Sequence, residues 1–206
     1  MKSSVIASSN PKYSREKLME AATTLFANKG FAAVSIRELA LAAGTNSGMI
    51  SYYFGGKEGL YAEVLESQFK AFFCALVPIL KNETDTMQKI KKFSQTLSSL
   101  HKEFPCIMRL YYSELTNPTA CFETVVKKYI AAGAKMLENT IAQGISEGNI
   151  KKNLNPSYSA LALAGMLNYY FIVQPVSDGI LPDSPKRDEE YLEEVLQIYL
   201  NGVKAK

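Results

Sequence analysis

The chain has 206 residues, of which 47% are hydrophobic, and its formal net charge is +3. This length and composition suit one medium-sized domain or a small domain joined to a larger one, and they exclude a mainly disordered chain. We find no apolar run of 18 or more residues and no signal-peptide core in residues 1–10, so we expect a cytoplasmic protein that does not enter a membrane.

The first predicted helix follows a short polar segment. Residues 1–12 are expected to form a flexible arm. Ser14 can cap a helix over residues 15–29, which Gly30 ends. Phe31 is expected to pack back on a small core, so residues 14–54 are predicted to form a compact three-helix unit.

The second and third predicted helices meet at a glycine. Ser35 and Glu38 have the spacing of a capping box, in which the hydroxyl accepts from the N–H near Glu38 and the carboxylate reaches back to the N–H of Ser35. Gly44 suits the left-handed end of this helix, and Asn46 suits the N-cap of a shorter helix through Tyr53. A helix, a glycine-containing turn and a second helix form the arrangement that places the second helix in a DNA major groove.

The rest of the chain is predicted to be helical as well. A long helix with an apolar stripe runs from Lys57 to about Leu80, and Pro78 disturbs its last turn. The later predicted helices cover residues 87–100, 105–115, 117–148, 155–173 and 186–203, with Asn-Pro pairs opening the third and fourth of these. No segment shows sustained strand alternation, so the predicted fold class is all-α: a three-helix unit followed by about six helices.

Cysteine and histidine usage argues against several kinds of chemistry. Cys74, Cys106 and Cys121 are odd in number and widely spaced, unlike a disulfide framework or a structural zinc site. We expect them to be buried or half-buried small apolar residues. With one histidine and no triad-like, phosphate-loop or metal-spaced pattern, we expect no enzyme, metal or cofactor.

The positive charge is concentrated near the N-terminus. Residues 1–59 carry seven Lys or Arg against four Glu, and the remaining residues balance to zero. The whole excess therefore lies in the segment with the helix-turn-helix pattern, as a nucleic-acid-binding protein requires.

Residues 13–60 resemble the N-terminal DNA-binding domain of the TetR family of bacterial transcriptional regulators. The matching residues agree in type and order: Phe26, Gly30, Phe31, Ser35, Ile36, Arg37, Leu39, Ala40, Ala43, Gly44, Gly48, Ile50, Tyr53, Phe54, Lys57, Glu58 and Leu60. Beyond Leu60 the resemblance rests on length and helix order. It implies a DNA-binding domain over residues 1–56 and a ligand-binding and dimerisation domain over residues 57–206.

The resemblance also implies a mechanism. Two subunits pair through their last two long helices, and each presents a recognition helix to half of a palindromic operator. A small apolar or aromatic effector binds in the larger domain, shifts the long helix and releases the DNA. The expected function is thus a ligand-responsive regulator, most simply a repressor. The alternative is a helical small-molecule-binding or adaptor protein without specific DNA binding.

The residues expected to contact DNA follow from the matched positions. They are Ser35, Arg37, Ser47, Gly48, Met49, Ser51, Tyr52, Tyr53 and Lys57. By the resemblance, Ser35, Tyr53 and Lys57 match phosphate-binding positions, Arg37 matches a position that often contacts a phosphate or a guanine, and the other five lie towards the groove. Other interpretations stay open: Arg37 can pair with a nearby carboxylate, and Tyr53 can be a core aromatic with only its hydroxyl exposed.

Three features depart from the family pattern. Ser51 stands where tyrosine is usual and Thr45 where valine is usual, and we expect the first change to alter operator preference. The Gly55-Gly56 pair makes a looser connection to the long helix than is usual in the family.

Large aromatic and sulfur-containing side chains in the second half are candidates for the effector pocket. They are Phe72, Phe73, Met108, Tyr111, Tyr112, Met136, Met166, Asn168, Tyr169 and Tyr170, although each can equally be plain core. Arg109 can meet a ligand carboxylate, but a surface pairing with Glu103 or Glu114 is expected first. His101 is expected to be a partly exposed residue at a helix end.

Overall fold

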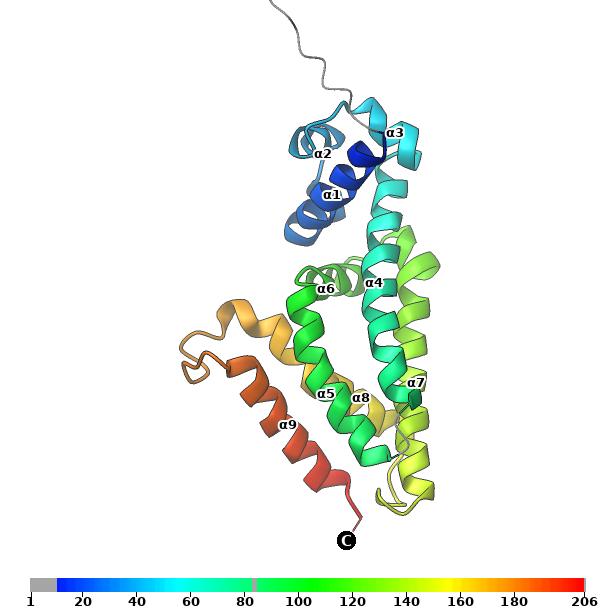
Figure 1. Cartoon of the computed structure of the whole chain (residues 1–206), viewed down its shortest axis with the longest axis vertical. Coiled ribbons are helices and arrows are strands. Elements are labelled where there is room, and N and C mark those ends of the chain that lie inside the picture. Colours follow the sequence, from blue (N-terminus) through cyan, green and yellow to red (C-terminus); the bar gives the residue numbers. More distant parts are fainter. Residues whose placement is uncertain (1–10, 83–84, 206) are drawn as a thin grey trace, which may run out of the picture.

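The structure, a computed structural model, describes residues 11–82 and 85–205 and consists of helices joined by short turns (Figure 1). The helices are α1 (Pro11–Ala33), α2 (Ile36–Ala42), α3 (Gly48–Phe54), α4 (Lys57–Asn82), α5 (Thr86–Glu103), α6 (Ile107–Thr116), η1 (Phe122–Val126), α7 (Lys127–Ser146), α8 (Pro156–Val173), η2 (Gln174–Val176) and α9 (Arg187–Val203). Among the described residues the only β contacts are two isolated bridges. The predicted all-α class is therefore confirmed.

The first three helices form the expected compact unit. Leu18, Phe26, Leu39 and Ile50 are completely buried in it. Helix α1 begins at Pro11, so the predicted cap at Ser14 is wrong: Ser14 lies inside the helix and is buried. The expected arm falls mostly on residues 1–10, which lie outside the described residues.

Gly30 ends the regular part of α1, as predicted. Its φ of 76° lies in the left-handed region, which a residue without Cβ adopts at little cost. The chain then turns so that the ring of Phe31 lies 6.0 Å from Phe26 and 4.9 Å from Tyr61, measured between ring centres. Phe31 therefore packs back on the core, which confirms the expectation.

Helix α4 is the element that both halves of the molecule share (Figure 1). Its first turns pack on α1 and α3, and its later turns pack on α5 and α7. Leu60, Val64 and Leu65 are fully buried in the same apolar cluster as Leu18 and Leu110. The packing is thus continuous across the boundary expected between residues 56 and 57.

The remaining helices enclose a second apolar cluster from α5, α7, α8 and α9. Asn155 caps α8 as predicted, accepting from the Tyr158 N–H at 3.1 Å. The predicted start of the preceding helix at Asn117 is wrong. Helical structure begins at Ala120, and the Thr119 hydroxyl accepts from the Cys121 N–H at 3.1 Å.

Helix α8 is unusually apolar for a helix with so much exposed surface. Residues 156–176 have a mean hydropathy of 1.2 in their most apolar window, of which 22% is buried, so length and composition alone would let this segment cross a membrane. The expectation that the chain does not enter a membrane therefore stays a prediction. Tyr158, Leu161 and Tyr169 are exposed by 76%, 72% and 58%, and their spacing places them along one face of the helix.

The three cysteines differ in exposure. Cys121 is buried and Cys106 is half-buried, as expected, whereas Cys74 is exposed. Burial raises the pKa of the thiols of Cys106 and Cys121. No group of three or more His, Cys, Asp or Glu residues in the described ranges could hold a metal ion.

Candidate DNA-binding face and effector cavity

The N-terminus of α2 retains the predicted capping box. The Ser35 hydroxyl accepts from the Glu38 N–H at 3.1 Å. The Glu38 carboxylate binds the Lys29 ammonium at 2.5 Å, and this bond, together with a backbone hydrogen bond from Ser35, holds the pKa of Glu38 below its usual value. Glu38 therefore serves the cap and also links α1 to α2.

The turn between α2 and α3 depends on Gly44 and Asn46. Gly44 has a φ of 61°, so the predicted left-handed glycine is present. The Asn46 side chain accepts from the Gly48 N–H at 2.8 Å. The helix itself starts at Gly48, and Ser47 is its N-cap residue. The capping hydrogen bond therefore comes from Asn46, one residue before the N-cap.

Helix α3 separates a buried face from an exposed one. Ile50 and Phe54 are buried, as their spacing indicated. Four of the five residues expected at the groove are exposed: Ser47, Gly48, Ser51 and Tyr52. Met49 is half-buried against the core, so only part of its side chain is available to a base.

The other candidate DNA contacts surround this helix. Ser35 and Arg37 are exposed on α2, and Arg37 forms no hydrogen bond or ion pair with any residue in the described ranges. The salt bridge considered for Arg37 is therefore absent among those residues. Tyr53 is half-buried on the core, and the Lys57 ammonium lies 4.3 Å from the centre of the Phe31 ring.

A buried polar cluster lies where α4 meets α6, beside the rings of Phe26 and Phe31 in this unit. Glu114 is completely buried and accepts from the Tyr61 hydroxyl at 2.8 Å, from the Thr119 N–H at 3.2 Å and from the Thr119 hydroxyl. Burial, with the hydrogen bond to Glu114, raises the pKa of Tyr61. The cluster therefore ties α4 to the end of α6 and to the turn after it.

This role of Glu114 was not among the predictions from the sequence. Arg109 binds the side chain of Asn28 in α1 rather than Glu103 or Glu114, so the expected surface pairing is wrong. A signal was present in the sequence: Ile107, Leu110 and Glu114 recur at helical spacing, which puts the carboxylate on the buried face of α6.

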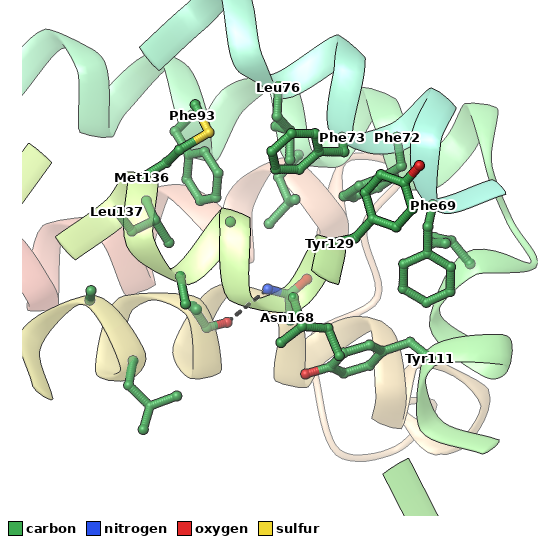
Figure 2. Close-up of a pocket in the computed structure, with 18 of the residues that line it drawn as sticks. Phe69, Phe72, Phe73, Leu76, Phe93, Tyr111, Tyr129, Met136, Leu137 and Asn168 are labelled. Atoms are coloured by element: carbon green, nitrogen blue, oxygen red, sulfur yellow. Dashed lines mark hydrogen bonds between the residues drawn. The ribbon is translucent and has the colours of Figure 1, made fainter. Parts of the chain in front are cut away.

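A cavity of about 270 Å³ lies between α4, α5, α6, α7 and α8 (Figure 2). Six of the ten pocket candidates line it: Phe72, Phe73, Met108, Tyr111, Met136 and Asn168. Side chains outside the predicted pocket also line it, among them Phe69, Leu76, Phe93, Leu97, Tyr129, Ile130, Leu137 and Leu161. The volume is near the lower end of the range for small-molecule sites.

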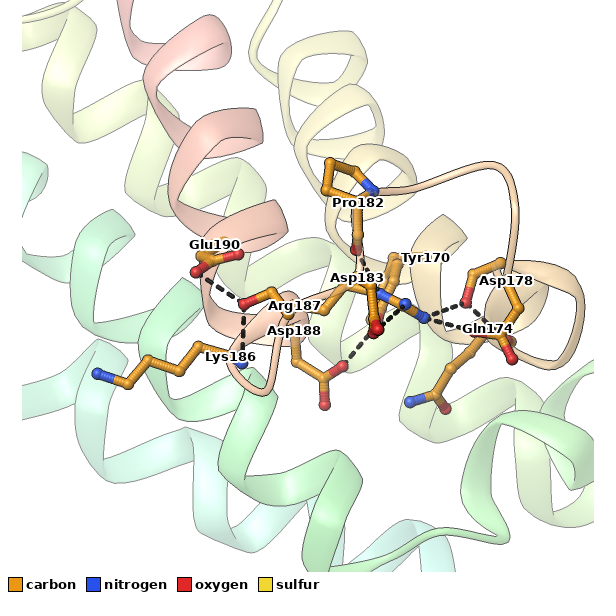
Figure 3. A network of polar contacts seen from close by, with 11 residues as sticks. Tyr170, Gln174, Asp178, Pro182, Asp183, Lys186, Arg187, Asp188 and Glu190 are labelled. Atoms are coloured by element: carbon orange, nitrogen blue, oxygen red, sulfur yellow. Dashed lines mark hydrogen bonds and ion pairs between the residues drawn. The ribbon is translucent and has the colours of Figure 1, made fainter.

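The other four candidates do not line this cavity. Tyr112 and Tyr169 are 40% and 58% exposed, and Met166 is half-buried. Tyr170 is buried but donates its hydroxyl to Asp188 at 2.5 Å, in a network that Arg187 extends to the loop before α9 (Figure 3). Consecutive helical residues point about 100° apart, so Asn168, Tyr169 and Tyr170 cannot all face the same space.

His101 lies behind the cavity wall. It is 8% exposed, its ring stacks on Phe171 at 3.6 Å between centres, and its Nε2 lies 3.3 Å from Asn168 Oδ1. Burial lowers the pKa of His101 to about 4, so the ring is neutral near pH 7. The expectation of a partly exposed helix-end residue was wrong because α8 covers the end of α5.

Comparison with known proteins agrees with these features. Residues 18–64 match the family described as bacterial regulatory proteins, tetR family. The chain is 31% identical to the HTH-type transcriptional repressor NicS of Pseudomonas putida, over 76% of this chain and 74% of NicS. It is 28% identical to a Bacillus subtilis protein named "Probable HTH-type transcriptional regulator YttP", over 92% and 93% of the two chains.

A solved structure has the same fold along most of its length. The ketosteroid transcriptional regulator KstR2 of Mycobacterium tuberculosis matches with a TM-score of 0.74 and 19% identity, over 93% of this chain and 95% of that one. The helix-turn-helix unit, the helix order and the sequence relatives all agree. The chain therefore belongs to the TetR family of bacterial transcriptional regulators.

Proposed function

We propose that this protein is a ligand-responsive repressor that binds a palindromic operator as a homodimer and leaves it when a small apolar effector fills the cavity. The observation that carries the proposal is the combination of an exposed α2–α3 face with an apolar cavity, joined by α4. In this division, residues 1–56 read DNA and residues 57–206 bind the effector and the partner subunit. The protein would act in the cytoplasm and would catalyse no reaction.

On the DNA side, the proposed contacts are those of the exposed face. Arg37, Ser47, Ser51 and Tyr52 would meet base edges or phosphates in the major groove. Ser35, Tyr53 and Lys57 would bind phosphates, and Gly48 would allow close approach of the backbone. Met49 would contribute only the exposed part of its side chain. Since Ser51 replaces the tyrosine usual in the family, the operator would differ from those of relatives.

Coupling between the two sites would run through packed helices. An effector held between α4 and α6 changes the separation of these helices. Both are tied to the DNA-binding unit, α4 directly and α6 through Arg109–Asn28, and Glu114–Tyr61 ties α6 to α4. A ligand that prefers the displaced arrangement then weakens operator binding, and the operator weakens ligand binding equally.

A footprint of the full-length protein on DNA flanking its own gene tests the DNA-binding part. We expect protection of a short palindrome that weakens as salt concentration rises. The same assay is repeated at low salt with fragments of the whole genome. If the protein protects no specific site there, the result would favour a helical binding protein without an operator.

The partner surface is proposed to be the exposed apolar face of α8 together with α9. Tyr158, Leu161 and Tyr169 are exposed there, as is Ile198 on α9. Burying such a face in a dimer removes apolar surface from water, which a monomer cannot do.

Sedimentation velocity at micromolar concentration tests this surface. We expect a dimer for the natural chain and for Leu41→Glu, a control because Leu41 is 83% exposed on α2. Tyr169→Glu should shift the population towards monomer. A natural chain that is monomeric would contradict the dimer, and recovery of the protein in the membrane fraction would assign α8 to a membrane instead.

A further inference from the structure

Most of the cavity lining is apolar, and its polar side chains are Tyr111, Tyr129, Glu138, Asn168 and Ser157, the last of which is exposed at the start of α8. Figure 2 shows Tyr111 of α6 and Asn168 of α8 on one side of the cavity, and Phe93, Met136 and Leu137 on the other. Helices α6 and α8 contact one another, which brings Tyr111 and Asn168 to the same region of the wall. A bound molecule would thus meet hydrogen-bonding groups along only part of its length.

The Asn168 amide is oriented by its neighbours. Its Nδ2 donates to the Ala164 carbonyl at 2.8 Å, and its Oδ1 lies 3.3 Å from His101 Nε2. His101 is itself fixed by stacking on Phe171. An amide nitrogen has two N–H groups, so one donor on Asn168 is left over from these contacts.

Tyr111 supplies a second donor. Its ring is half-buried in the cavity wall, and its hydroxyl forms no hydrogen bond with any residue in ranges 11–82 and 85–205. The other tyrosine in the lining is different, because the Tyr129 hydroxyl donates to Glu66 at 2.6 Å. Tyr111 and Asn168 therefore each keep one donor that the protein does not use.

The charge around the cavity is the third observation. Among the residues that the structure describes, the lining includes no Lys, Arg or His, and the one carboxylate there, Glu138, binds Lys135 at 2.9 Å. His101 behind Asn168 is neutral near pH 7 because burial lowers its pKa to about 4. A buried carboxylate of a ligand would find no cation in this wall, and an unpaired buried charge is strongly disfavoured.

We propose that the cavity selects a neutral, largely apolar molecule with one oxygen acceptor, such as a ketone, which accepts from Tyr111 and Asn168, and that it rejects carboxylates of the same shape. This inference rests on the proposed function, because it names the chemical class of the effector. It makes Tyr111 and Asn168 the specificity-determining residues of the cavity.

Calorimetric titration with three naphthalenes of similar size tests the proposal. They are 2-acetylnaphthalene, 2-ethylnaphthalene and 2-naphthoate, which differ in carrying a ketone, a hydrocarbon group or a carboxylate. We expect the ketone to bind the full-length protein at least tenfold more tightly than the carboxylate at pH 7.5. Tyr111→Phe and Asn168→Leu should each weaken ketone binding about three- to tenfold while leaving hydrocarbon binding unchanged or stronger.

Matched controls separate this effect from loss of folding. Tyr112→Phe removes a neighbouring hydroxyl that does not line the cavity, so ketone affinity should not change. Retained binding of 2-ethylnaphthalene shows that each variant keeps its cavity. Two outcomes would overturn the assignment of Tyr111 and Asn168 alone. The carboxylate could bind as tightly as the ketone, or both variants could lose equal affinity for the ketone and the hydrocarbon. Binding of none of the three compounds would overturn the effector cavity and with it the ligand part of the proposed function.

Discussion

The DNA-binding face and the effector cavity use the chain in different ways. The candidate DNA contacts all lie between Ser35 and Lys57, and short-range features position them: a cap at Ser35, a left-handed glycine at Gly44 and the helical spacing of Ile50 and Phe54. The cavity takes side chains from five helices between Phe69 and Asn168. A local motif therefore defines the first site, whereas the relative placement of whole helices defines the second.

The two regions meet at Glu114, where the largest effect is expected. Glu114→Ala removes the acceptor of the buried Tyr61 hydroxyl and of Thr119, so the free energy of unfolding should fall by about 3 kcal/mol or more. Chemical denaturation followed by circular dichroism measures this. Glu66→Ala is the matched control, because Glu66 also accepts from a tyrosine, but its side chain is 38% exposed and less than about 1 kcal/mol should be lost.

A second test of Glu114 concerns communication between the regions. Tyr61→Phe should weaken the effect of a bound ligand on operator affinity more than it changes ligand binding itself. Unchanged ligand control of operator affinity in Tyr61→Phe would show that the buried cluster does not join the two regions. Equal stability losses in the two glutamate variants would contradict the special cost of removing the buried Glu114.

The stability of the protein should depend on pH through His101, which lies behind the cavity wall. The pKa of histidine is about 6.5 when unfolded, and burial lowers that of His101 to about 4. The unfolded chain therefore binds more protons between these values. This contribution to stability is complete above pH 6.5 and is lost as the pH falls to 4, in total about 3 kcal/mol.

Denaturation at pH 7.5, 6 and 5 measures this dependence. His101→Phe keeps a ring against Phe171 but cannot titrate, so its stability should fall less on acidification than that of the natural chain. Asp188 also acts on His101, and it is unchanged in this comparison. Parallel curves for the two proteins would contradict a neutral buried histidine.

On the DNA side, Arg37 and Lys57 should have separable roles. Arg37→Ala should reduce discrimination between operator and random DNA by about tenfold, since a lost arginine–base pair is worth roughly 1–3 kcal/mol. Lys57→Ala should weaken binding to all sequences alike and lower the salt dependence by about one counterion. Electrophoretic mobility shifts at several salt concentrations measure both, and an Arg37→Ala variant that binds operator and random DNA with equal loss of affinity would contradict the assigned division. Ligand binding should stay unchanged in both variants.

The smallest expected effect concerns the link after α3. Gly55 has a φ of 73° and open space around its Cα, so Gly55→Ala introduces only backbone strain, about 1 kcal/mol of unfolding free energy. Gly202 in α9 also has open space and no positive φ, so Gly202→Ala should be neutral or stabilising by up to about 1 kcal/mol. Equal stabilities in thermal melts would mean that the left-handed link carries no such strain.

The contrast between the regions also explains how far the sequence could be interpreted. Capping by Ser35 and Asn155, the turn at Gly44 and the buried face of α3 follow from neighbours three or four residues away, so they were predictable. The start of α1 was missed because Ser14, a good cap by type, is buried within a longer helix.

The cavity was only half predictable for a related reason. Aromatic and methionine side chains mark apolar surface, but they do not say which helix packs against it. Tyr170 illustrates this, because it lies in α8 only two residues after Asn168, yet its hydroxyl faces Asp188 of α9. Helical spacing could put Glu114 on the buried face of α6, but neither its partner Tyr61 nor the position of His101 under α8 was predictable, since each partner lies more than fifty residues away.

Sequence alone thus determined the all-α class, the helix-turn-helix unit and its exposed face, because periodicity, caps and glycine conformations act over one or two helical turns. Only the tertiary structure decided which side chains surround the cavity and which polar groups are buried between α4 and the end of α6. The physical reason is that burial and long-range hydrogen bonds depend on how helices distant in the chain pack together. The DNA-binding face is a property of its own segment, and the cavity is a property of the whole fold.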